Sequence, residues 1–481
     1  LPEHDEYLSS SQRPCDRMSL RRVRAMPPVS RRALRNALVG TALVLSQHWA
    51  PPQLRAQSSP DTSAHAMAAM PPGPLRIPVS RMGSGTSWLP DATPMYMHHW
   101  QAGSWELMLH YNVFVQYIRE GSQRGDDQFG SINWVMGMAR RPLGGGWLWL
   151  RPMLSLERLT VGLCGYPDLL ATGEICHGEP LVDRQHPHDL FMELAAIYQR
   201  ALSRDLAGEL YLAVAGEPAL GPTAYPHRPS ALPNPIAPIT HHWIDATHIA
   251  FGVVTAGIYG RRWKAEVSLF NGREPDENRF DIDLATVDSY SGRLSFLPGE
   301  RWSLQVSGGH LEDAEANPNG EPPTTVNRYT ASAIYHRPLR DGGIWATTAV
   351  WGMNNEHGHN TNAFLLETNL DLRERDLIFG RAEVAKKAAE DFGLPGGHER
   401  TFTVGKVSVG YVRQFGPFAG IVAGVGGLFS IGMVPDDIEF FYGTELPPGF
   451  AIYLRGSPAP MRMQATHPMH PPAPPHHEGA R

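Results

Sequence analysis

Two short stretches of the 481-residue chain concentrate histidine and aspartate: DRQHPHDL at residues 183–190 and THHWIDATH at residues 240–248. Imidazole and carboxylate groups bind zinc, copper or nickel, so two loops that converge could supply three or four ligands to one ion. The candidate metal ligands are His186, His188, His241 and His242, with copper or zinc as the ion. Two alternatives stay open: a rigid loop whose histidines bond to the backbone, and a catalytic role.

Methionine and histidine also recur together near both ends of the chain, in HAMAAM (residues 65–70), PMYMHHW (94–100) and the tail 461–481. Thioether and imidazole groups together suit copper, particularly Cu(I). These segments favour copper binding as an alternative function. Ordinary low-complexity sequence in an exported protein is the other interpretation.

Enzymatic motifs are missing from the sequence: it holds no GxSxG elbow, HExxH, CxxC or phosphate-binding glycine loop. His110 or His248 could serve a hydrolase on a barrel wall, but no serine stands beside either with any specificity. We therefore predict no catalytic residues and no enzyme, and keep a barrel hydrolase as a third hypothesis.

The elements that must position these residues show a period of two. In WELMLHYNVFVQY (residues 105–117), apolar residues occupy the odd positions and mostly polar ones the even positions. Such alternation predicts a strand with one apolar face, and many segments of about ten residues are typical of transmembrane β-barrels. About sixteen segments begin near residues 104, 130, 146, 188, 206, 247, 261, 285, 301, 325, 342, 361, 375, 401, 416 and 449.

Connections between these segments alternate between short and long. Residues 203–205 and 260–262 are short connections, whereas 161–187 and 217–246 are long. Outer-membrane barrels have short periplasmic turns and long extracellular loops. The sequence thus predicts an all-β, transmembrane, antiparallel up-and-down β-barrel of about 16 strands. One segment, residues 188–202, also fits helical spacing; we predict a strand there, because it pairs naturally with residues 208–216.

Aromatic residues flank the short connections, as expected for side chains at a membrane boundary. A soluble β-sandwich would alternate too, but has no reason to place aromatics on both sides of its short turns. The flanking residues are Trp147, Trp149, Tyr259, Trp263, Phe296, Trp302, Tyr335, Trp345, Tyr411 and Phe418.

The other register carries charges of both signs, which predicts a water-filled, charged lumen. Salt-bridge ladders that only stiffen the wall are the alternative. The long segment 217–246, rich in proline, could fold inward and narrow the pore. The predicted pore-lining residues are Glu106, Arg151, Glu157, Glu193, Lys264, Glu266, Arg293, Arg328, Glu367, Arg381 and Glu383.

The N-terminal region has the form of an export signal, with a basic start and a short apolar run at residues 37–45 before LRAQ. Export permits a disulfide between Cys164 and Cys176, which we favour over two free thiols. We expect a leader at 1–57, a Met/His-containing periplasmic lead-in at 58–103, the barrel at 104–456 and a flexible tail at 457–481. The net charge of −6 makes nucleic acid an unsuitable partner.

Strand number, threading and aromatic girdle over residues 105–455 resemble bacterial outer-membrane porin-type channels. Residues 83–95, 183–195 and 268–279 resemble segments of an uncharacterised family of exported Gram-negative barrel proteins. The Met/His-rich lead-in is similar to that of copper-resistance outer-membrane protein B. Unlike typical porins, the chain continues past Arg455 rather than ending on an aromatic of its last strand.

These features predict an outer-membrane channel that passes small polar solutes or ions. Its expected partners are outer-membrane lipid, the solutes themselves and the barrel-assembly machinery. A copper-binding resistance protein and a barrel hydrolase are the alternatives.

Overall fold

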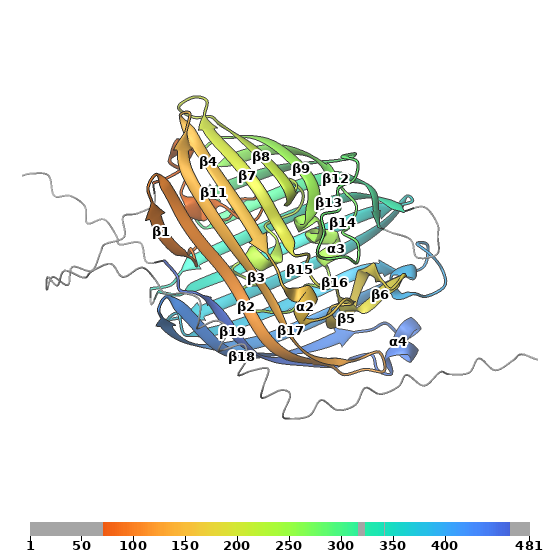
Figure 1. Ribbon diagram of the computed structural model, residues 1–481. Helices are drawn as coiled ribbons and strands as arrows, with labels where there is room; N and C mark the ends of the chain where they lie inside the picture. The colour runs from red at the N-terminus through yellow and green to blue at the C-terminus, as the bar shows by residue number, and fades with distance from the viewer. Residues whose placement is uncertain (1–70, 316–322, 341, 462–481) are drawn as a thin grey trace, which may run out of the picture. The chain divides into compact units, whose positions relative to one another are not determined.

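Sixteen antiparallel strands form a closed barrel in the computed structural model, which describes residues 71–315, 323–340 and 342–461 (Figure 1). The ring closes where β19 pairs with β2, from Gly449 opposite Glu120 to Gly456 opposite Val113. Closure pairs the backbone of every strand on both sides, which a membrane requires because hydrocarbon offers no hydrogen-bond partner. The predicted all-β, up-and-down barrel of about sixteen strands is confirmed.

Each barrel strand begins within five residues of a predicted start, since a long period-two pattern fixes where a strand lies. The strands are β2 (Trp105–Glu120), β3 (Asp127–Leu143), β4 (Gly146–Leu154), β7 (Phe191–Ala201), β8 (Ala207–Gly216), β9 (Ala250–Tyr259), β10 (Trp263–Asn271), β11 (Ser289–Gly299), β12 (Trp302–Glu315), β13 (Thr324–Pro338), β14 (Ile344–Glu356), β15 (His359–Leu372), β16 (Asp376–Ala388), β17 (Thr401–Phe418), β18 (Ile421–Met433) and β19 (Pro448–Pro458).

The segment that was ambiguous between helix and strand is β7. It pairs with β4 on one side and with β8 on the other, so its backbone hydrogen bonds are satisfied across the sheet. Sheet pairing on both sides decides between two periodicities that the sequence alone allows.

Several elements were not predicted, because most are too short for a periodicity to show and one 11-residue strand is buried along most of its length without alternation. The strand β1 (His98–Ala102) pairs with the start of β2. The connection between β4 and β7 contains the hairpin β5 (Tyr166–Cys176) and β6 (Glu179–Gln185), seen at one end of the barrel in Figure 1. Short helices are α2 (Glu157–Thr160), α3 (His241–Ile244) and α4 (Asp436–Tyr442).

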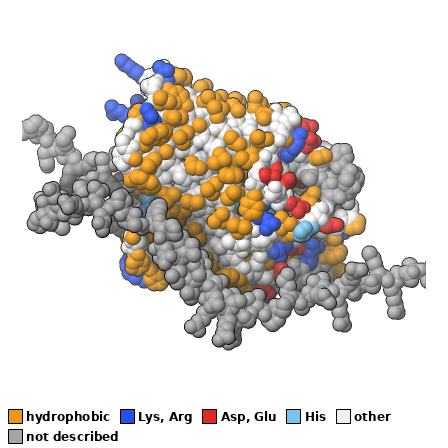
Figure 2. Space-filling model, viewed as in Figure 1, with side chains coloured by type: hydrophobic (Ala, Val, Ile, Leu, Met, Phe, Trp, Pro, Cys, Tyr) orange, Lys and Arg blue, Asp and Glu red, His pale blue; other side chains and the backbone are white. Residues whose placement is uncertain are grey.

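Alternate residues of the strands point outward and make an apolar outer face. Figure 2 shows hydrophobic side chains across this face, with charged side chains gathered toward its ends. On β15, for example, Phe364 and Leu366 are exposed while Leu365 and Glu367 are buried. Among the described residues, no helix is long and apolar enough to cross a membrane.

Part of the predicted aromatic girdle is confirmed, and part is wrong. Trp263, Phe296, Trp302, Trp345, Tyr411 and Phe418 are exposed on the outer surface near the short turns. Trp149 and Tyr259 are buried and point inward with the polar register, and the Arg140 guanidinium lies over the rings of Trp147 and Trp149. The error comes from assigning aromatics by their closeness to a turn, because a change of one position along a strand reverses the face.

Replacing Leu366 with arginine tests whether this outer face meets lipid. Leu366 is 54% exposed near the middle of β15. A charge at the midplane of a membrane barrel costs about 2–4 kcal/mol, whereas one near the interface costs about 0–1 kcal/mol. We expect urea unfolding from lipid vesicles to show this loss for Leu366→Arg and little loss for Leu202→Arg, in the turn between β7 and β8. Equal effects of the two substitutions would contradict the lipid-facing assignment.

Candidate functional site

The charged residues predicted to line a pore are all buried, and none is more than 6% exposed. Ten of them lie on barrel strands in the inward register. Glu157 does not, because it lies in α2, where its carboxylate accepts hydrogen bonds from the backbone N–H and the ring Nδ1 of His188. The described lumen is therefore occupied by protein rather than lined with exposed charge.

Ion pairs between neighbouring strands hold many of these charges. Arg151 of β4 lies 2.6 Å from Glu193 of β7, and Arg140 of β3 lies 2.5 Å from Glu106 of β2. Lys264 contacts Glu209 at 2.5 Å. These ion pairs are needed because burying a charge without a partner costs several kcal/mol of folding free energy.

The lead-in segment 71–97 lies inside the barrel at the end with the short turns. Arg151 donates a hydrogen bond to the carbonyl of Gly85 at 2.5 Å, and Lys264 donates one to the carbonyl of Thr86 at 2.6 Å. The Ser303 hydroxyl bonds to the carbonyl of Trp88 at 2.7 Å. The wall charges of β4 and β10 thus bind backbone carbonyls of the chain that precedes the barrel.

The connection between β8 and β9, residues 217–249, also folds into the barrel; we call it the inner segment. Its residues are almost all buried. Its contacts reach the opposite wall: Arg228 lies 2.7 Å from Glu367 of β15, and Ser230 lies 2.7 Å from Thr348 of β14. Tyr453 of β19 donates a hydrogen bond to the carbonyl of Pro233 at 2.7 Å.

The inner segment and the lead-in also touch each other. The hydroxyls of Ser87 and Thr223 are 2.8 Å apart, and the backbone N–H of Ala224 donates to the Ser84 hydroxyl at 2.8 Å. The lead-in contacts the wall from β3 to β13. The inner segment contacts β2, β14, β15, β16 and β19, and also β4, β10 and β12. Together they fill both halves of the lumen.

The inner segment and the β6–β7 connection bring the four predicted metal ligands together. The ring centroids of His186 and His242 are 5.8 Å apart, and those of His241 and His242 are 5.4 Å apart. His248 joins the cluster, 5.2 Å from His188 and 5.1 Å from His241. Two stretches that are well separated in sequence therefore meet inside the barrel. His357 lies outside this cluster, and its ring contacts that of His398.

In most of these histidine rings, one nitrogen faces a hydrogen-bond acceptor. The Nδ1 atoms of His188, His241 and His242 lie 2.9, 2.8 and 2.9 Å from carboxylate oxygens of Glu157, Asp245 and Glu274, respectively. His248 donates from Nδ1 to the carbonyl of Asp245. For His188 and His241, a carboxylate that holds Nδ1 fixes the orientation of the ring, as outer-shell carboxylates do for metal-binding histidines.

Burial is the main cause that lowers the pKa values of His186, His241 and His248. The charge of Arg279 lowers the pKa of His186 further and neighbouring histidines that of His248, whereas the contact with Asp245 opposes the shift at His241. The rings are consequently neutral at pH 7, the form that binds metal. Histidines that bond to the backbone, the alternative interpretation, describe His248 but not His241 or His242.

His227 of the inner segment occupies a different, apolar environment. Its Nε2 is 3.4 Å from the Met153 sulfur, and its ring is 4.9 Å from that of Trp134. Burial lowers the pKa of His227 well below its usual value, and the charges of His110 and Arg151 act in the same direction.

Acidification is expected to destabilise the protein through His227. In the unfolded chain this histidine takes up a proton near the ordinary histidine pKa of about 6.5, whereas the folded ring does not. The stability is fully present above that pH and falls as the pH drops, by up to about 1.4 kcal/mol per pH unit. Urea midpoints at about pH 7.5 and 5 should therefore separate more for the wild type than for His227→Gln. An equal separation would show that His227 contributes nothing.

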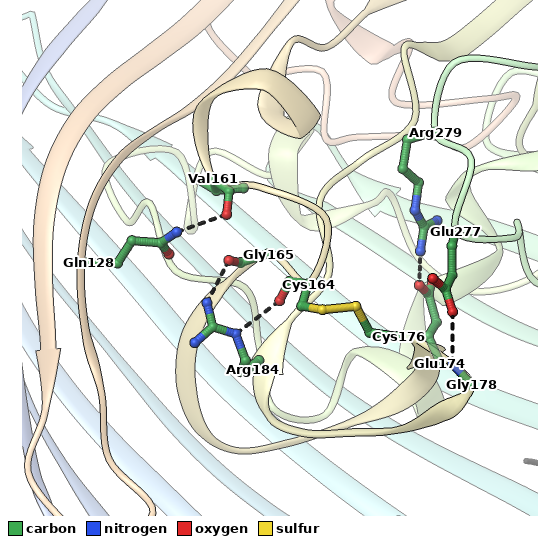
Figure 3. The surroundings of a disulfide bond; sticks show 10 residues. All are labelled: Gln128, Val161, Cys164, Gly165, Glu174, Cys176, Gly178, Arg184, Glu277 and Arg279. Atoms are coloured by element: carbon green, nitrogen blue, oxygen red, sulfur yellow. Dashed lines mark hydrogen bonds and ion pairs between the residues drawn. A yellow bond between two sulfur atoms is a disulfide. The ribbon is translucent and has the colours of Figure 1, made fainter. Parts of the chain in front are cut away.

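A disulfide joins Cys164 to Cys176, with 5.6 Å between their Cα atoms, and closes the loop that carries β5 (Figure 3). Arg184 of β6 donates hydrogen bonds to the carbonyls of Cys164 and Gly165. Arg279, from the β10–β11 connection, pairs with Glu174. These contacts fix the hairpin that ends just before His186.

Some predicted features lie outside the described residues: the leader, the Met/His stretch at 65–70 and the tail beyond Met461. Other important residues were missed. Arg228 and the lead-in contacts carry no periodic signal, because irregular backbone has none. The only hint for Arg228 was a lone charge within a proline-rich stretch.

No protein-family model matches the chain, and no curated protein matches it. Solved structures with a similar fold include Salmonella typhi OmpF in complex with daunomycin (9% identity, TM-score 0.47, covering 75% of this chain and 100% of that one). Others are an anion-selective porin from Comamonas acidovorans (10%, 0.44, 73% and 99%) and the outer-membrane expressed OmpT of Vibrio cholerae (6%, 0.43, 75% and 100%). The likeness is confined to the fold.

Proposed function

We propose that this protein is an outer-membrane channel for small polar solutes or ions, and that the inner segment obstructs its lumen in the described conformation. The closed ring of sixteen strands with an apolar outer face supports a location in a membrane. The charged inner wall supports a polar passage once the inner segment leaves, since charges of both signs can line a water-filled lumen.

The observation that carries the proposal is the mode of attachment of the inner segment. It contacts the wall of β14–β16, β19 and β2 through apolar packing of Ile236, Trp243 and Ile244. It also does so through hydrogen bonds and ion pairs, such as those of Arg228, Ser230 and the Ile236 carbonyl. Water can replace such partners when a segment leaves, whereas an apolar interface would resist exposure. Several wall groups, including Gln116 and one nitrogen each of Arg140 and Arg381, have no protein partner among the described residues. These groups favour hydration of the boundary.

Planar-bilayer recording of the purified full-length protein tests the proposal. We expect brief openings from a mainly closed state, and a salt-dependent current that reverses at a defined potential under a salt gradient. A protein that inserts into the bilayer, yet conducts neither as the wild type nor after removal of the inner segment, would contradict it.

A further inference from the structure

We propose that His242, Glu274 and Glu315 bind a divalent transition-metal ion of the zinc class in a cleft at the long-loop end of the barrel. One potential ligand atom from each residue lies within 4.8 Å of the other two. The ligand atoms of a tetrahedral ion, each about 2.1 Å from it, are about 3.4 Å apart. Binding therefore needs each pair of ligand atoms to close by at most about 1.4 Å, shared between two side chains.

Three separate elements hold the ligands in place. His242 lies on α3 of the inner segment, and its backbone carbonyl accepts a hydrogen bond from Asn354 at 3.2 Å. Glu274 follows β10, and its backbone N–H donates to the carbonyl of Ala314, the residue before Glu315. The two carboxylates are thus neighbours by backbone pairing and not through flexible side chains alone.

The approach of the imidazole is made possible by Gly173 of β5. A Cβ atom at this position would lie 2.4 Å from His242 Nε2, so any larger residue would displace the ring. Gly173 also has a φ of +111°, a backbone conformation that other residues adopt only with strain. The hairpin β5–β6 therefore shapes the cleft around the ring.

Charge in the cleft favours a cation. The cavity has a volume of about 390 Å³, and its lining includes Glu174, Glu179, Glu274, Glu315 and Asp391. Arg279 neutralises Glu174, and His242 bonds to Glu274. No side chain among the described residues forms a hydrogen bond or ion pair with the carboxylate of Glu315, and nearby Arg328 bonds to Asn354 instead.

The donor set identifies the class of ion. One imidazole and two carboxylates suit zinc and its transition-metal neighbours, whereas calcium and magnesium prefer oxygen ligands alone. Three protein ligands leave a coordination position for water in the cleft. The bound ion would link the inner segment to β10 and β12, and so stabilise the obstructed state; this consequence rests on the proposed function, but binding itself does not.

Isothermal titration of the full-length protein with Zn²⁺ in detergent micelles tests the site. Histidines elsewhere in the chain can add further sites, so the decisive quantity is the difference between Glu315→Gln and the matched control Glu312→Gln. Glu312 lies on the same strand, in contact with His310 and outside the ligand group. We expect Glu315→Gln to bind one ion fewer per chain than the control, and Glu274→Gln to behave like Glu315→Gln.

A second readout separates loss of binding from loss of fold. Zn²⁺ should raise the urea midpoint of the wild type and of Glu312→Gln by the same amount, and that of Glu315→Gln by less. Equal zinc stoichiometry and equal stabilisation in both variants would overturn the site, as would a lack of zinc binding by the wild type. Zinc binding in micelles is measured without any channel recording. A failure of the conductance experiment would therefore leave the zinc result unaffected.

Discussion

Replacement of residues 219–246 by a short glycine–serine loop is expected to raise the single-channel conductance several-fold and to remove closures. The deletion takes away every contact of the inner segment with β2, β14–β16 and β19. The wall charges that it uncovers, including Glu367, Arg381 and Glu383, become solvated, and solvated charges of both signs line a conducting lumen. The lead-in stays in place over the other half of the barrel.

The matched control shortens a loop that lies outside the lumen. Residues 284–287 of the β10–β11 connection are exposed, so their deletion should leave the conductance at the wild-type value. Circular dichroism of both proteins checks that the barrel still forms. A folded deletion protein with wild-type conductance would show that the inner segment does not obstruct the pathway.

Replacing Arg228 with alanine is expected to lower the free energy of unfolding by about 3–5 kcal/mol. Arg228 is fully buried, and its guanidinium contacts Asp245 and Glu367 at 2.7 Å each. Without it, Asp245 of the inner segment and Glu367 of the wall lose the cation they share, and Glu367 keeps only Arg381, at 3.2 Å. Repulsion between them should also release the segment, so longer openings are expected in the same variant.

Urea unfolding in micelles measures the first effect and bilayer recording the second. Arg413→Ala is the control, because Arg413 pairs with Asp376 at the exposed end of β16 and takes no part in the lumen. A loss in Arg228→Ala no larger than in Arg413→Ala would contradict the anchoring role of Arg228.

The barrel could be predicted from sequence because alternation repeats over some sixteen segments, so that many weak signals support one another. Glu106 and Glu367 could also be assigned to the inward-facing register, by counting alternate residues along their strands. Glu157 could not, because the strand ends at Leu154 and the chain turns into α2. Near the strand ends, closeness to a turn also placed Trp149 and Tyr259 on the wrong face.

The segments that fill the lumen could not be predicted from the period-two alternation. The inner segment and the lead-in are irregular, and their contacts join Arg228 to Glu367 across 139 residues and Thr86 to Lys264 across 178. Nothing local encodes such pairs. The histidines are an intermediate case, since the threading placed His186 and His242 at the same end of the barrel, but the burial of His248 and the contacts of Glu274 depend on how the loops fold.

A reversible covalent link between the inner segment and the wall tests the central claim most directly. Ser230 and Thr348 are both buried, and their hydroxyl oxygens lie 2.7 Å apart, so cysteines at these two positions should form a disulfide. We predict that single channels of the Ser230→Cys/Thr348→Cys protein stay closed when oxidised and open after reduction, while each single-cysteine protein ignores the reductant. Equal conductance of the oxidised and reduced double variant, with the link verified by mass spectrometry, would contradict an obstructing inner segment.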